Sequence, residues 1–433
     1  MSMIYDTIVI GAGQAGLATG YYLQKAGLRF LILEGSDQPG GSWPHFYDSL
    51  SLNSPARYSS LPGLPFPGQP DRYPRRDEAV AYLRSYAAHF ALPIITGTRV
   101  LQIERSGRFF RVITGDKGCY RARTIVAATG FFGQPYMPNL PGQADYRGQL
   151  LHAAEYRRPE PFRGQRIVVV GGGNAAVQIG VELAQVARVT LAARHPIRYL
   201  PQRLLGKDIH FWLNLTGLDR AQWLDDQSTP VFDTGAYRTA VVSGQPDLRP
   251  MFERFTEDGL IWSDGRHEKV DTVLFATGYR PHLPYLAELG ALDQAGRALQ
   301  RQGASTSVPG LYYVGLPRQR NAASATLRGA GADARIVVNH LRRYAETQRE
   351  SQGRHAAGVI VKRQTRIWTG RGNELIALIT LMILALKQQI TAQGLASPRL
   401  LGEAVIRSVM ISAGFLGVGH AAALYAPHLM RSS

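Results

Sequence analysis

Two glycine-rich turns are the residues whose types and spacing point most directly to chemistry. The first is GAGQAG at 11–16 and the second is GGGNAA at 171–176. In such a turn the first glycine makes a tight bend, the second lets the backbone approach a pyrophosphate, and the third position lets a helix pack closely on a strand. Each turn therefore predicts a dinucleotide site at the N-terminus of a helix.

The first turn has the context that this motif needs. It follows the apolar run IVI and opens a helical pattern. Glu34 ends the next predicted strand, close to the usual spacing of about 20 residues for an acid that binds the adenosine ribose hydroxyls. The residues predicted to contact a cofactor here are Gly11, Gly13, Gln14, Ala15, Gly16 and Glu34.

The second turn has alanine at its third position, and its following strand, VTLAA, ends in Arg194 where the first unit has Glu34. A carboxylate there would repel a 2′-phosphate, whereas a guanidinium can bind it through paired hydrogen bonds. This predicts NADPH, with Arg198 or Arg203 as a second contact, unless Arg194 is simply solvated surface. The predicted contacts are Gly171, Gly173, Asn174, Ala175 and Arg194.

The elements around the turns predict the fold. Each turn lies in a βαβ unit, because a continuous apolar run is typical of a buried parallel strand and Ala and Leu recur at helical spacing after each turn. The second unit interrupts the first domain, whose closing strand comes late in the chain. Further predicted elements are a helix near 78–90, strands near 99–103, 109–113, 124–128, 270–275 and 311–314, and a helix near 331–344.

We therefore expect an α/β fold with two Rossmann-like, three-layer dinucleotide-binding domains, the second inserted into the first. The predicted limits are 1–160 and 270–345 for the first domain and 161–269 for the second, with a linker and helical extension over 346–433.

The extension begins with the polar stretch AETQRESQGRH from Ala345, which predicts a linker. Two apolar segments follow, from Leu375 and from Ser408. A helical hairpin that packs on the body or on a second subunit is the favoured interpretation, which leaves a homo-oligomer open. Peripheral contact with a membrane surface and a true span are the alternatives, and the first segment is shorter than the roughly 20 residues a span needs.

Composition excludes several classes. The single cysteine, Cys119, cannot form an internal disulfide or a CxxC pair, which excludes dithiol relays. The net charge of +17 is mostly dispersed arginine without a basic run, so no nucleic-acid partner is expected. No histidine cluster has metal-ligand spacing, so no metal is expected. The N-terminal apolar stretch runs directly into a glycine turn, so it is interpreted as a strand and not as a signal peptide. This predicts a cytoplasmic protein.

With these motifs in place, the chain resembles the class B flavin monooxygenases, the group of the flavin-containing monooxygenases and the plant indole-pyruvate monooxygenases, over roughly 4–344. Four segments carry the resemblance: GGSW at 40–43, YRGQLLHAAEY at 146–156, ATG at 128–130 and ATGY at 276–279. The second is similar to the family fingerprint FxGxxxHxxxY, with Tyr146 in place of Phe.

The resemblance implies FAD in the first domain and NADPH in the second. It adds to the cofactor contacts Gly41, Ser42, Trp43, Thr129, Gly130, Thr277, Gly278 and Gly315. It also implies that His152 and Tyr156 tune the movement of the second domain and its cofactor, although a structural role for His152 stays open.

Asn53 lies in LNSPARYSSLPGLPFP, which aligns with the family segment whose asparagine lies beside the flavin. An amide there can donate a hydrogen bond to a flavin-bound peroxide. The alternative is that Asn53, before Ser54-Pro55, is only a good turn residue. Trp43 is not followed by the Arg-containing extension of Baeyer–Villiger members, and Leu316 stands where many reductase-type flavoproteins have Asp, which favours the monooxygenase branch.

The function this implies is an NADPH-dependent monooxygenase that inserts one oxygen atom from O2 into a small organic substrate through a flavin peroxide. The sequence leaves two alternatives: an NADPH-dependent flavin oxidase or reductase, and a redox-sensing flavoprotein with a membrane or protein partner. The pocket walls come from loops whose sequence has no readable code, so the substrate is not predicted.

Overall fold

The computed structural model describes residues 3–115, 118–217 and 230–354. They belong to a compact unit over Met1–Ala356, and a second unit spans Ala357–Ser433. The apolar segments predicted from Leu375 and Ser408 lie outside the described residues, so their interpretation stays a prediction.

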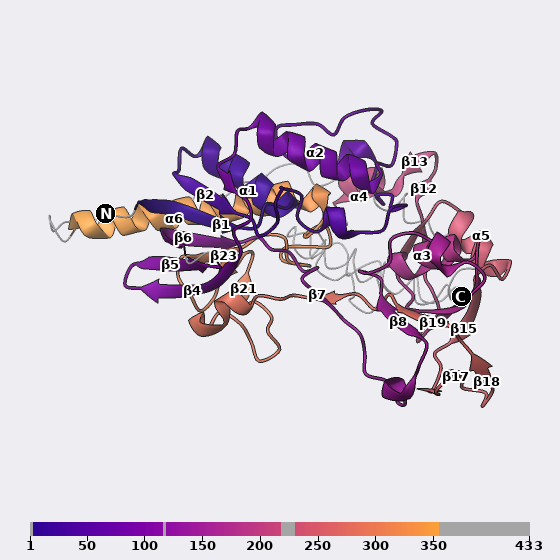
Figure 1. The fold of residues 1–433 in the computed structure, drawn as a ribbon. Coiled ribbons are helices and arrows are strands. Elements are labelled where there is room, and N and C mark those ends of the chain that lie inside the picture. The colour runs from indigo at the N-terminus through magenta and orange to yellow at the C-terminus, as the bar shows by residue number, and fades with distance from the viewer. Residues whose placement is uncertain (1–2, 116–117, 218–229, 355–433) are drawn as a thin grey trace, which may run out of the picture. The chain divides into compact units, whose positions relative to one another are not determined.

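The first sheet has nine strands, and its parallel part has the order β3-β2-β1-β6-β23 (Figure 1). β4 and β5 form an antiparallel meander with β6, and β21 and β22 continue the sheet beyond β23. The strands are β1 (Ile4–Ile10), β2 (Phe30–Leu33), β3 (Ile94–Ile95), β4 (Val100–Ser106), β5 (Phe109–Thr114), β6 (Cys119–Ala127), β21 (Gln300–Arg301), β22 (Ala304–Ser305) and β23 (Leu311–Tyr313).

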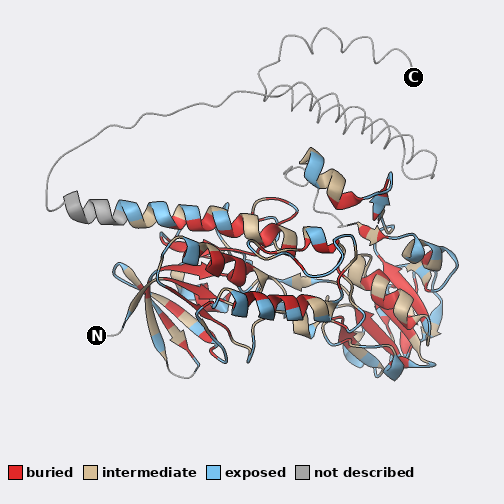
Figure 2. Cartoon of the chain, turned by 90° about the horizontal axis from the view of Figure 1, so that it is seen from above, coloured by how far each residue is buried: buried red, intermediate tan, exposed pale blue. Residues whose placement is uncertain are grey.

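Side chains alternate along β1, so its residues pack in two hydrophobic cores, one on each face of the first sheet. Val9 packs with the helices α1 (Gln14–Lys25), α2 (Arg76–His89) and α6 (Leu327–Arg354). Ile8 and Ile10 pack on the other face with β4, β5 and the 3-10 helix η6 (Pro284–Leu289). Burial is deepest in β2 and β23, all of whose residues are buried, whereas β4 at the edge of the sheet is largely intermediate or exposed; Figure 2 shows the outer faces of the helices exposed.

The second sheet has five parallel strands in the order β15-β10-β9-β19-β8. Ile167 and Val169 of β9 pack with α3, whereas Val168 and Val170 pack with β16 and β17, which form an antiparallel meander with β18. The elements are β8 (Gln149–His152), β9 (Arg166–Val170), α3 (Asn174–Leu183), β10 (Arg188–Ala193), α5 (Ala236–Val242), β15 (Asp247–Pro250), β16 (Arg254–Phe255), β17 (Gly259–Ile261), β18 (His267–Lys269) and β19 (Thr272–Phe275).

The two sheets repeat one plan. In each, the strand before the glycine turn is central, and the strand after the following helix lies beside it. A helix covers one face and a small antiparallel meander covers the other. The prediction of two Rossmann-like domains in an α/β fold is therefore confirmed.

Two boundaries differ from those predicted. β8 and β19 belong to the second sheet, so the strands of this sheet extend from Gln149 to Phe275, beyond the predicted domain limits of 161–269 at both ends. The reason is that β19 is a buried apolar strand that pairs with β9 on one side and β8 on the other. The polar stretch after Ala345 is not a linker as far as Arg354, because α6 continues through it. Its Glu, Gln and Arg residues are good helix formers.

Two chain connections join the sheets. β7 (Gln134–Pro135) and β20 (Tyr279–Arg280) pair antiparallel, so the two connections run side by side (Figure 1). A further segment carries β11 (Tyr199–Pro201), β12 (Arg203–Leu204), β13 (Lys207–Asp208) and α4 (Ile209–Thr216), and β11 pairs with β14 (Val231–Asp233).

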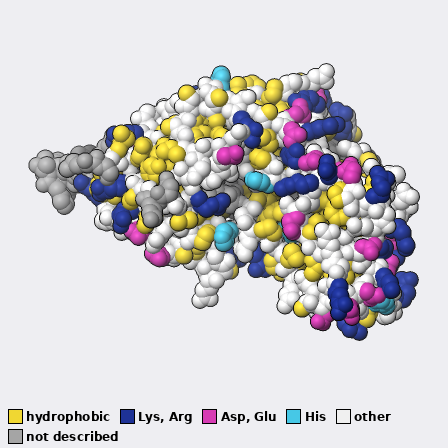
Figure 3. All heavy atoms as spheres, in the orientation of Figure 1, with side chains coloured by type: hydrophobic (Ala, Val, Ile, Leu, Met, Phe, Trp, Pro, Cys, Tyr) yellow, Lys and Arg dark blue, Asp and Glu magenta, His cyan; other side chains and the backbone are white. Residues whose placement is uncertain are grey.

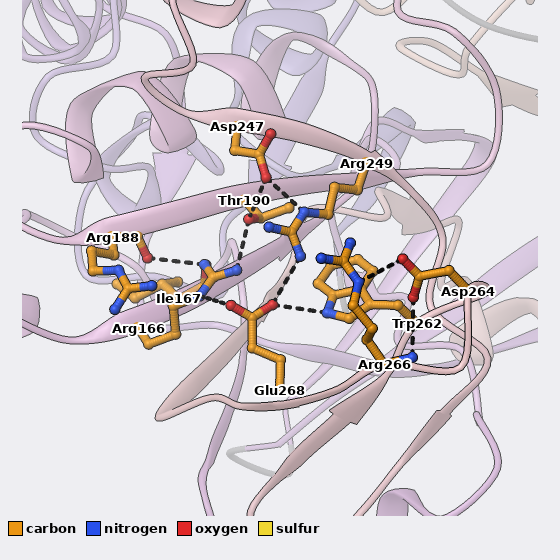
Figure 4. Close-up of polar contacts among 10 residues, drawn as sticks. All are labelled: Arg166, Ile167, Arg188, Thr190, Asp247, Arg249, Trp262, Asp264, Arg266 and Glu268. Carbon is orange, nitrogen blue, oxygen red and sulfur yellow. Dashed lines mark hydrogen bonds and ion pairs between the residues drawn. The ribbon is translucent and has the colours of Figure 1, made fainter.

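An ion network fastens the meander of the second sheet to its strands (Figure 4). Glu268 on β18 accepts hydrogen bonds from Arg166 Nε at 2.8 Å, Arg249 Nη1 at 3.0 Å and Trp262 Nε1 at 2.8 Å. Arg166 also donates to Thr190 Oγ1 at 2.7 Å. Burial alone raises the pKa of Glu268, but these bonds outweigh it and hold that pKa below its usual value.

Charged side chains are mixed on the face drawn in Figure 3. Over the second sheet and its meander, Lys and Arg side chains lie beside Asp and Glu side chains. Around the second sheet, opposite charges pair at the surface, as in Arg147 with Glu257 and Arg266 with Asp264. This face therefore has the dispersed charge that the composition predicts.

Candidate active site

The first glycine turn needs two of its glycines for packing. Gly11 has a φ of +101°, and a Cβ added there would lie 2.9 Å from the carbonyl oxygen of Ala128. A Cβ at Gly16 would lie 1.8 Å from the carbonyl oxygen of Gly11. Side chains at these positions would push α1 away from β1 and the turn away from the end of β6. The glycine pattern is therefore a requirement of this backbone.

The GGSW segment packs on this turn. Gly41 has a φ of +58°, and its added Cβ would lie 2.9 Å from Gly13 Cα. Trp43 Nε1 donates to Gln14 Oε1 at 2.7 Å, and Gln14 Nε2 donates to the carbonyl oxygen of Ala325 at 2.7 Å. The segment that includes Ser42, the glycine turn and the loop before α6 are thus joined through Gln14, a link that the motif itself does not predict.

Glu34 lies beside the same turn at the end of β2. It is buried, Oε2 accepts from the Ala12 N–H at 2.6 Å, and Oε1 accepts from the Ser36 N–H at 2.9 Å. Each carboxylate oxygen has a further lone pair that a ribose hydroxyl could use. Gly315, after β23, closes the site from the other side, since its added Cβ would lie 2.7 Å from Ala15 Cβ.

The second turn is built more openly. Gly171 has a φ of +145°, and its added Cβ would lie 2.6 Å from the carbonyl oxygen of Ala276. At Gly173 an added Cβ would meet no atom within 4 Å. The Asn174 side chain is used by the protein itself: Oδ1 accepts from the Phe232 N–H at 2.9 Å and Nδ2 donates to the Pro230 carbonyl oxygen at 3.2 Å.

Arg194 directly follows β10 and is exposed. Ala175, next to Asn174 in α3, is partly buried, and Arg198 and Arg203 are exposed. The sheet therefore places Arg194 past the carboxyl end of β10, the edge at which the second glycine turn also lies, as the sequence predicts.

The connections after β6 and β19 carry the ATG and ATGY segments. Thr129 Oγ1 and Tyr285 Oη share a hydrogen bond of 2.9 Å, and Thr277 Oγ1 donates to the Tyr136 carbonyl oxygen. Gly130 and Gly278 have φ of +69° and +82°, which favours glycine at both bends.

His152 ties β8 to the second connection. It is almost fully buried, Nδ1 accepts from the Ala154 N–H at 3.1 Å, and Nε2 lies 3.0 Å from the carbonyl oxygen of Gly278. These contacts assign the proton to Nε2, which donates to that carbonyl. Burial lowers the pKa of His152 below its usual value, which favours the neutral ring. His152 therefore positions the ATGY segment.

Tyr156 is buried in the core of the second sheet. Its hydroxyl donates to Glu182 Oε2 on α3 at 2.8 Å, and its ring lies 6.1 Å from that of Tyr47. Burial raises the pKa of Tyr156 well above its usual value. The structure does not bring this hydroxyl together with the polar atoms of His152.

Asn53 lies where the first sheet's loop region meets the second sheet. Gln178 Nε2, on α3, donates to Asn53 Oδ1 at 3.3 Å, and Gln202 Nε2 donates to the Asn53 carbonyl oxygen at 2.9 Å. Gln178 Oε1 in turn accepts from the Tyr47 hydroxyl. The bond from Gln178 assigns oxygen to the amide atom that faces it, so Asn53 Nδ2 is a donor without a partner among the described residues.

Sequence reasoning missed Gln178, Gln202 and Tyr47. Gln178 lies four residues after Asn174 on α3, so helical spacing from the glycine turn could have singled it out. Gln202 and Tyr47 have no such signal. Within residues 3–115, 118–217 and 230–354 no group of acidic, histidine or cysteine side chains could hold a metal ion, and no helix is long and apolar enough to span a bilayer.

Comparisons with known proteins agree with this geometry. A family model described as pyridine nucleotide-disulphide oxidoreductase matches residues 8–315. An uncharacterized CzcO-like oxidoreductase of Geobacillus kaustophilus is 35% identical over 348 residues, which cover 79% of this chain and 99% of the relative. The indole-3-pyruvate monooxygenase YUCCA4 of Oryza sativa is 29% identical over 386 residues, which cover 77% of this chain and 86% of the relative.

Among solved structures, a flavin-containing monooxygenase from Stenotrophomonas maltophilia matches with a TM-score of 0.72 and 33% identity, over 80% of this chain and 100% of that one. The cysteine pair that a disulphide reductase needs is absent, because Cys119 is the single cysteine of the sequence and is exposed. The chain belongs to the class B flavin monooxygenases of the pyridine nucleotide-disulphide oxidoreductase family and is a flavoprotein oxidoreductase.

Proposed function

We propose that the protein is a cytoplasmic, NADPH-dependent FAD monooxygenase that transfers one oxygen atom from O2 to a small organic substrate. The observation that carries this proposal is the position of Asn53, whose amide bonds to α3 directly behind the second glycine turn. The monooxygenase names of the relatives from Oryza sativa and Stenotrophomonas maltophilia support the reaction class.

The residues of the first turn fit FAD. Gly13 and Gly41 lie so close together that a Cβ at Gly41 would come within 2.9 Å of Gly13 Cα, and without side chains both backbones could approach a pyrophosphate. Glu34 would hold the ribose, and the N-terminus of α1 would face the phosphates. Gly11, Ala15, Gly16 and Gly315 would shape the backbone around the cofactor.

The residues of the second turn fit NADPH. The space at Gly173 is open to a pyrophosphate, and Arg194 would hold the 2′-phosphate through a charge-assisted contact. Asn174, whose amide binds the backbone beside β14, would shape the site indirectly.

Bound together, the two cofactors supply hydride transfer and oxygen activation. The chain supplies orientation, exclusion of water and hydrogen bonds. Asn53 Nδ2 is held by the bonds that Gln178 and Gln202 make to Asn53, so it is a preorganised donor. His152 and Tyr156 are positioning residues, since one binds the Gly278 carbonyl and the other binds Glu182.

The Asn53→Ala variant tests this proposal. A preorganised donor of this kind is worth about 2.7–4 kcal/mol, so oxygenation of a substrate such as thioanisole or indole-3-pyruvate should fall by roughly two to three powers of ten. Flavin reduction by NADPH in a stopped-flow instrument should be nearly unchanged, and hydrogen peroxide should be released in place of product.

Asn339→Ala is the matched control, because this asparagine is exposed on α6. Normal coupling of NADPH oxidation to product in Asn53→Ala would leave Asn53 as a turn residue. Stoichiometric hydrogen peroxide from the unaltered protein, whatever substrate is offered, would instead favour a flavin oxidase.

A further inference from the structure

A buried cluster of polar and aromatic side chains lies between the loop 50–75 and helix α4, outside the cofactor sites. Asp208 caps α4, and its Oδ1 accepts from both the N–H of His210 at 2.7 Å and the ring Nδ1 of His210 at 2.8 Å. The hydroxyl of Tyr73, from the loop, donates to Oδ2 at 2.5 Å. One buried carboxylate thus accepts three hydrogen bonds.

These bonds keep Asp208 ionised. Burial alone raises its pKa, but the bonds from His210 and Tyr73 outweigh it and hold the pKa of Asp208 below its usual value. Burial also raises the pKa of Tyr73 and of Tyr58, so both phenols stay neutral. Among the described residues, Asp208 is therefore the charged group that contacts His210.

The imidazole is held on three sides. Its ring stacks on Tyr58 at a centroid distance of 6.1 Å and on Phe232 at 5.6 Å, with interplanar angles of 29° and 20°. Asp208 fixes the proton on Nδ1. The side chain is only 7% exposed, and Nε2 has no hydrogen-bond partner among the described residues.

The cluster is next to Asn53. Gln202 Nε2 donates to the Asn53 backbone carbonyl oxygen, and the backbone carbonyl oxygen of Gln202 accepts from the Ile209 N–H at 2.9 Å. Tyr58, which stacks on His210, belongs to the 3-10 helix η2 (Ala56–Tyr58) that follows Asn53. The two segments that carry Tyr58 and His210 are therefore both linked to Asn53, the residue proposed to act in oxygen transfer.

We propose that His210 is a substrate-contacting residue whose Nε2 accepts a proton from the ammonium group of an amine substrate. This rests on the proposed function, because an amine needs a free electron pair to take an oxygen atom. An N–H bond of the ammonium breaks, an Nε2–H bond forms, and the electron pair stays on the substrate nitrogen. The resulting imidazolium is stabilised by the Asp208 carboxylate, whose negative charge also attracts the cation beforehand.

The first test compares two probes on the oxidised, FAD-loaded full chain: benzylamine, which carries an ammonium, and thioanisole, which has no exchangeable proton. Dissociation constants come from calorimetry, without NADPH turnover, so the result is independent of whether oxygen transfer occurs. His210→Gln should reduce the affinity ratio of benzylamine to thioanisole by roughly 10- to 150-fold, as expected for a lost hydrogen bond to a charged group.

His267→Gln is the matched control, since His267 also pairs with an aspartate, Asp258, but is exposed. An unchanged ratio in His210→Gln, or an equal fall in the control, would overturn the proposal.

A second measurement covers the case in which His210→Gln does not fold. In the ¹⁵N-histidine-labelled, unaltered protein, the ring nitrogens of His210 are identified by through-bond correlation to its assigned backbone. Benzylamine should shift its Nε2 resonance to that of an imidazolium, and thioanisole should not. An Nε2 chemical shift that does not change with benzylamine, or that changes equally with both probes, would overturn the proposal.

Discussion

The two glycine turns lie at the same place on two sheets of one plan, yet the protein packs them differently. Around the first, Gly41 closes on Gly13, and Gln14 binds both Trp43 and the loop before α6. Around the second, an added Cβ at Gly173 meets nothing within 4 Å, and Arg194 is exposed. The first site is enclosed by its own chain and the second is open.

This difference matches the two cofactors proposed. An enclosed turn suits FAD, which stays bound through many reaction cycles, whereas an open turn suits NADPH, which must enter and leave. The same backbone motif can thus serve a resident or an exchanging ligand, and the loops packed on it decide which.

The largest expected effect separates the two turns directly. Gly13→Val should yield colourless protein, because a Cβ at Gly13 would already lie 3.4 Å from Gly41 Cα, so the valine methyl groups would push the GGSW segment off the turn and block close approach of a pyrophosphate. Gly173→Val should stay yellow and lose NADPH binding instead. The ratio of flavin to protein absorbance and a titration with NADPH check both. Stoichiometric FAD in Gly13→Val would remove the assignment of FAD to the first turn.

A smaller effect is expected at the open site. Arg194→Ala should raise the Michaelis constant for NADPH, and not for NADH, by a factor of roughly 10 to 150, which corresponds to a charge-assisted contact of about 1.5–3 kcal/mol. Arg188→Ala, at the other end of β10, is the matched control. Equal losses for both nucleotides would place the phosphate contact elsewhere.

The smallest effect concerns the stability of the second sheet, whose meander is fastened by Glu268. Glu268→Gln should destabilise the protein by about 1–3 kcal/mol at neutral pH, because Arg166 and Arg249 would lose a charged partner. NADPH binding should be lost on heating before FAD fluorescence is released. Glu257→Gln, an exposed partner of Arg147, should change little.

The same residue predicts a pH dependence. The folded pKa of Glu268 lies below its unfolded value of 4.5, so its contribution is present above that pH and is lost as the pH falls through the folded pKa. The melting temperatures of the unaltered protein and of Glu268→Gln should therefore converge between neutral pH and pH values below 4.5. A constant difference across that range would show that Glu268 acts through packing alone.

The sequence by itself determined the elements whose signals are local. The glycine turns, the strands before them and the helix α2 follow from residue types within short windows, and the structure supplies the steric reason for Gly11 and Gly16. The motifs also identified Asn53 and His152 as residues of interest, although their roles stay predictions.

Only the tertiary structure decided what these residues contact. The strands at 149–152 and 272–275 belong to the second sheet because each pairs with a parallel strand there. The residue types within a short stretch of sequence do not indicate which strand will be the partner. Asn53 meets Gln178, 125 residues away, and Tyr73 meets Asp208, 135 residues away. Hydrogen bonds between such distant residues depend on how two sheets and their loops pack, and one sequence carries no periodic signal for that packing.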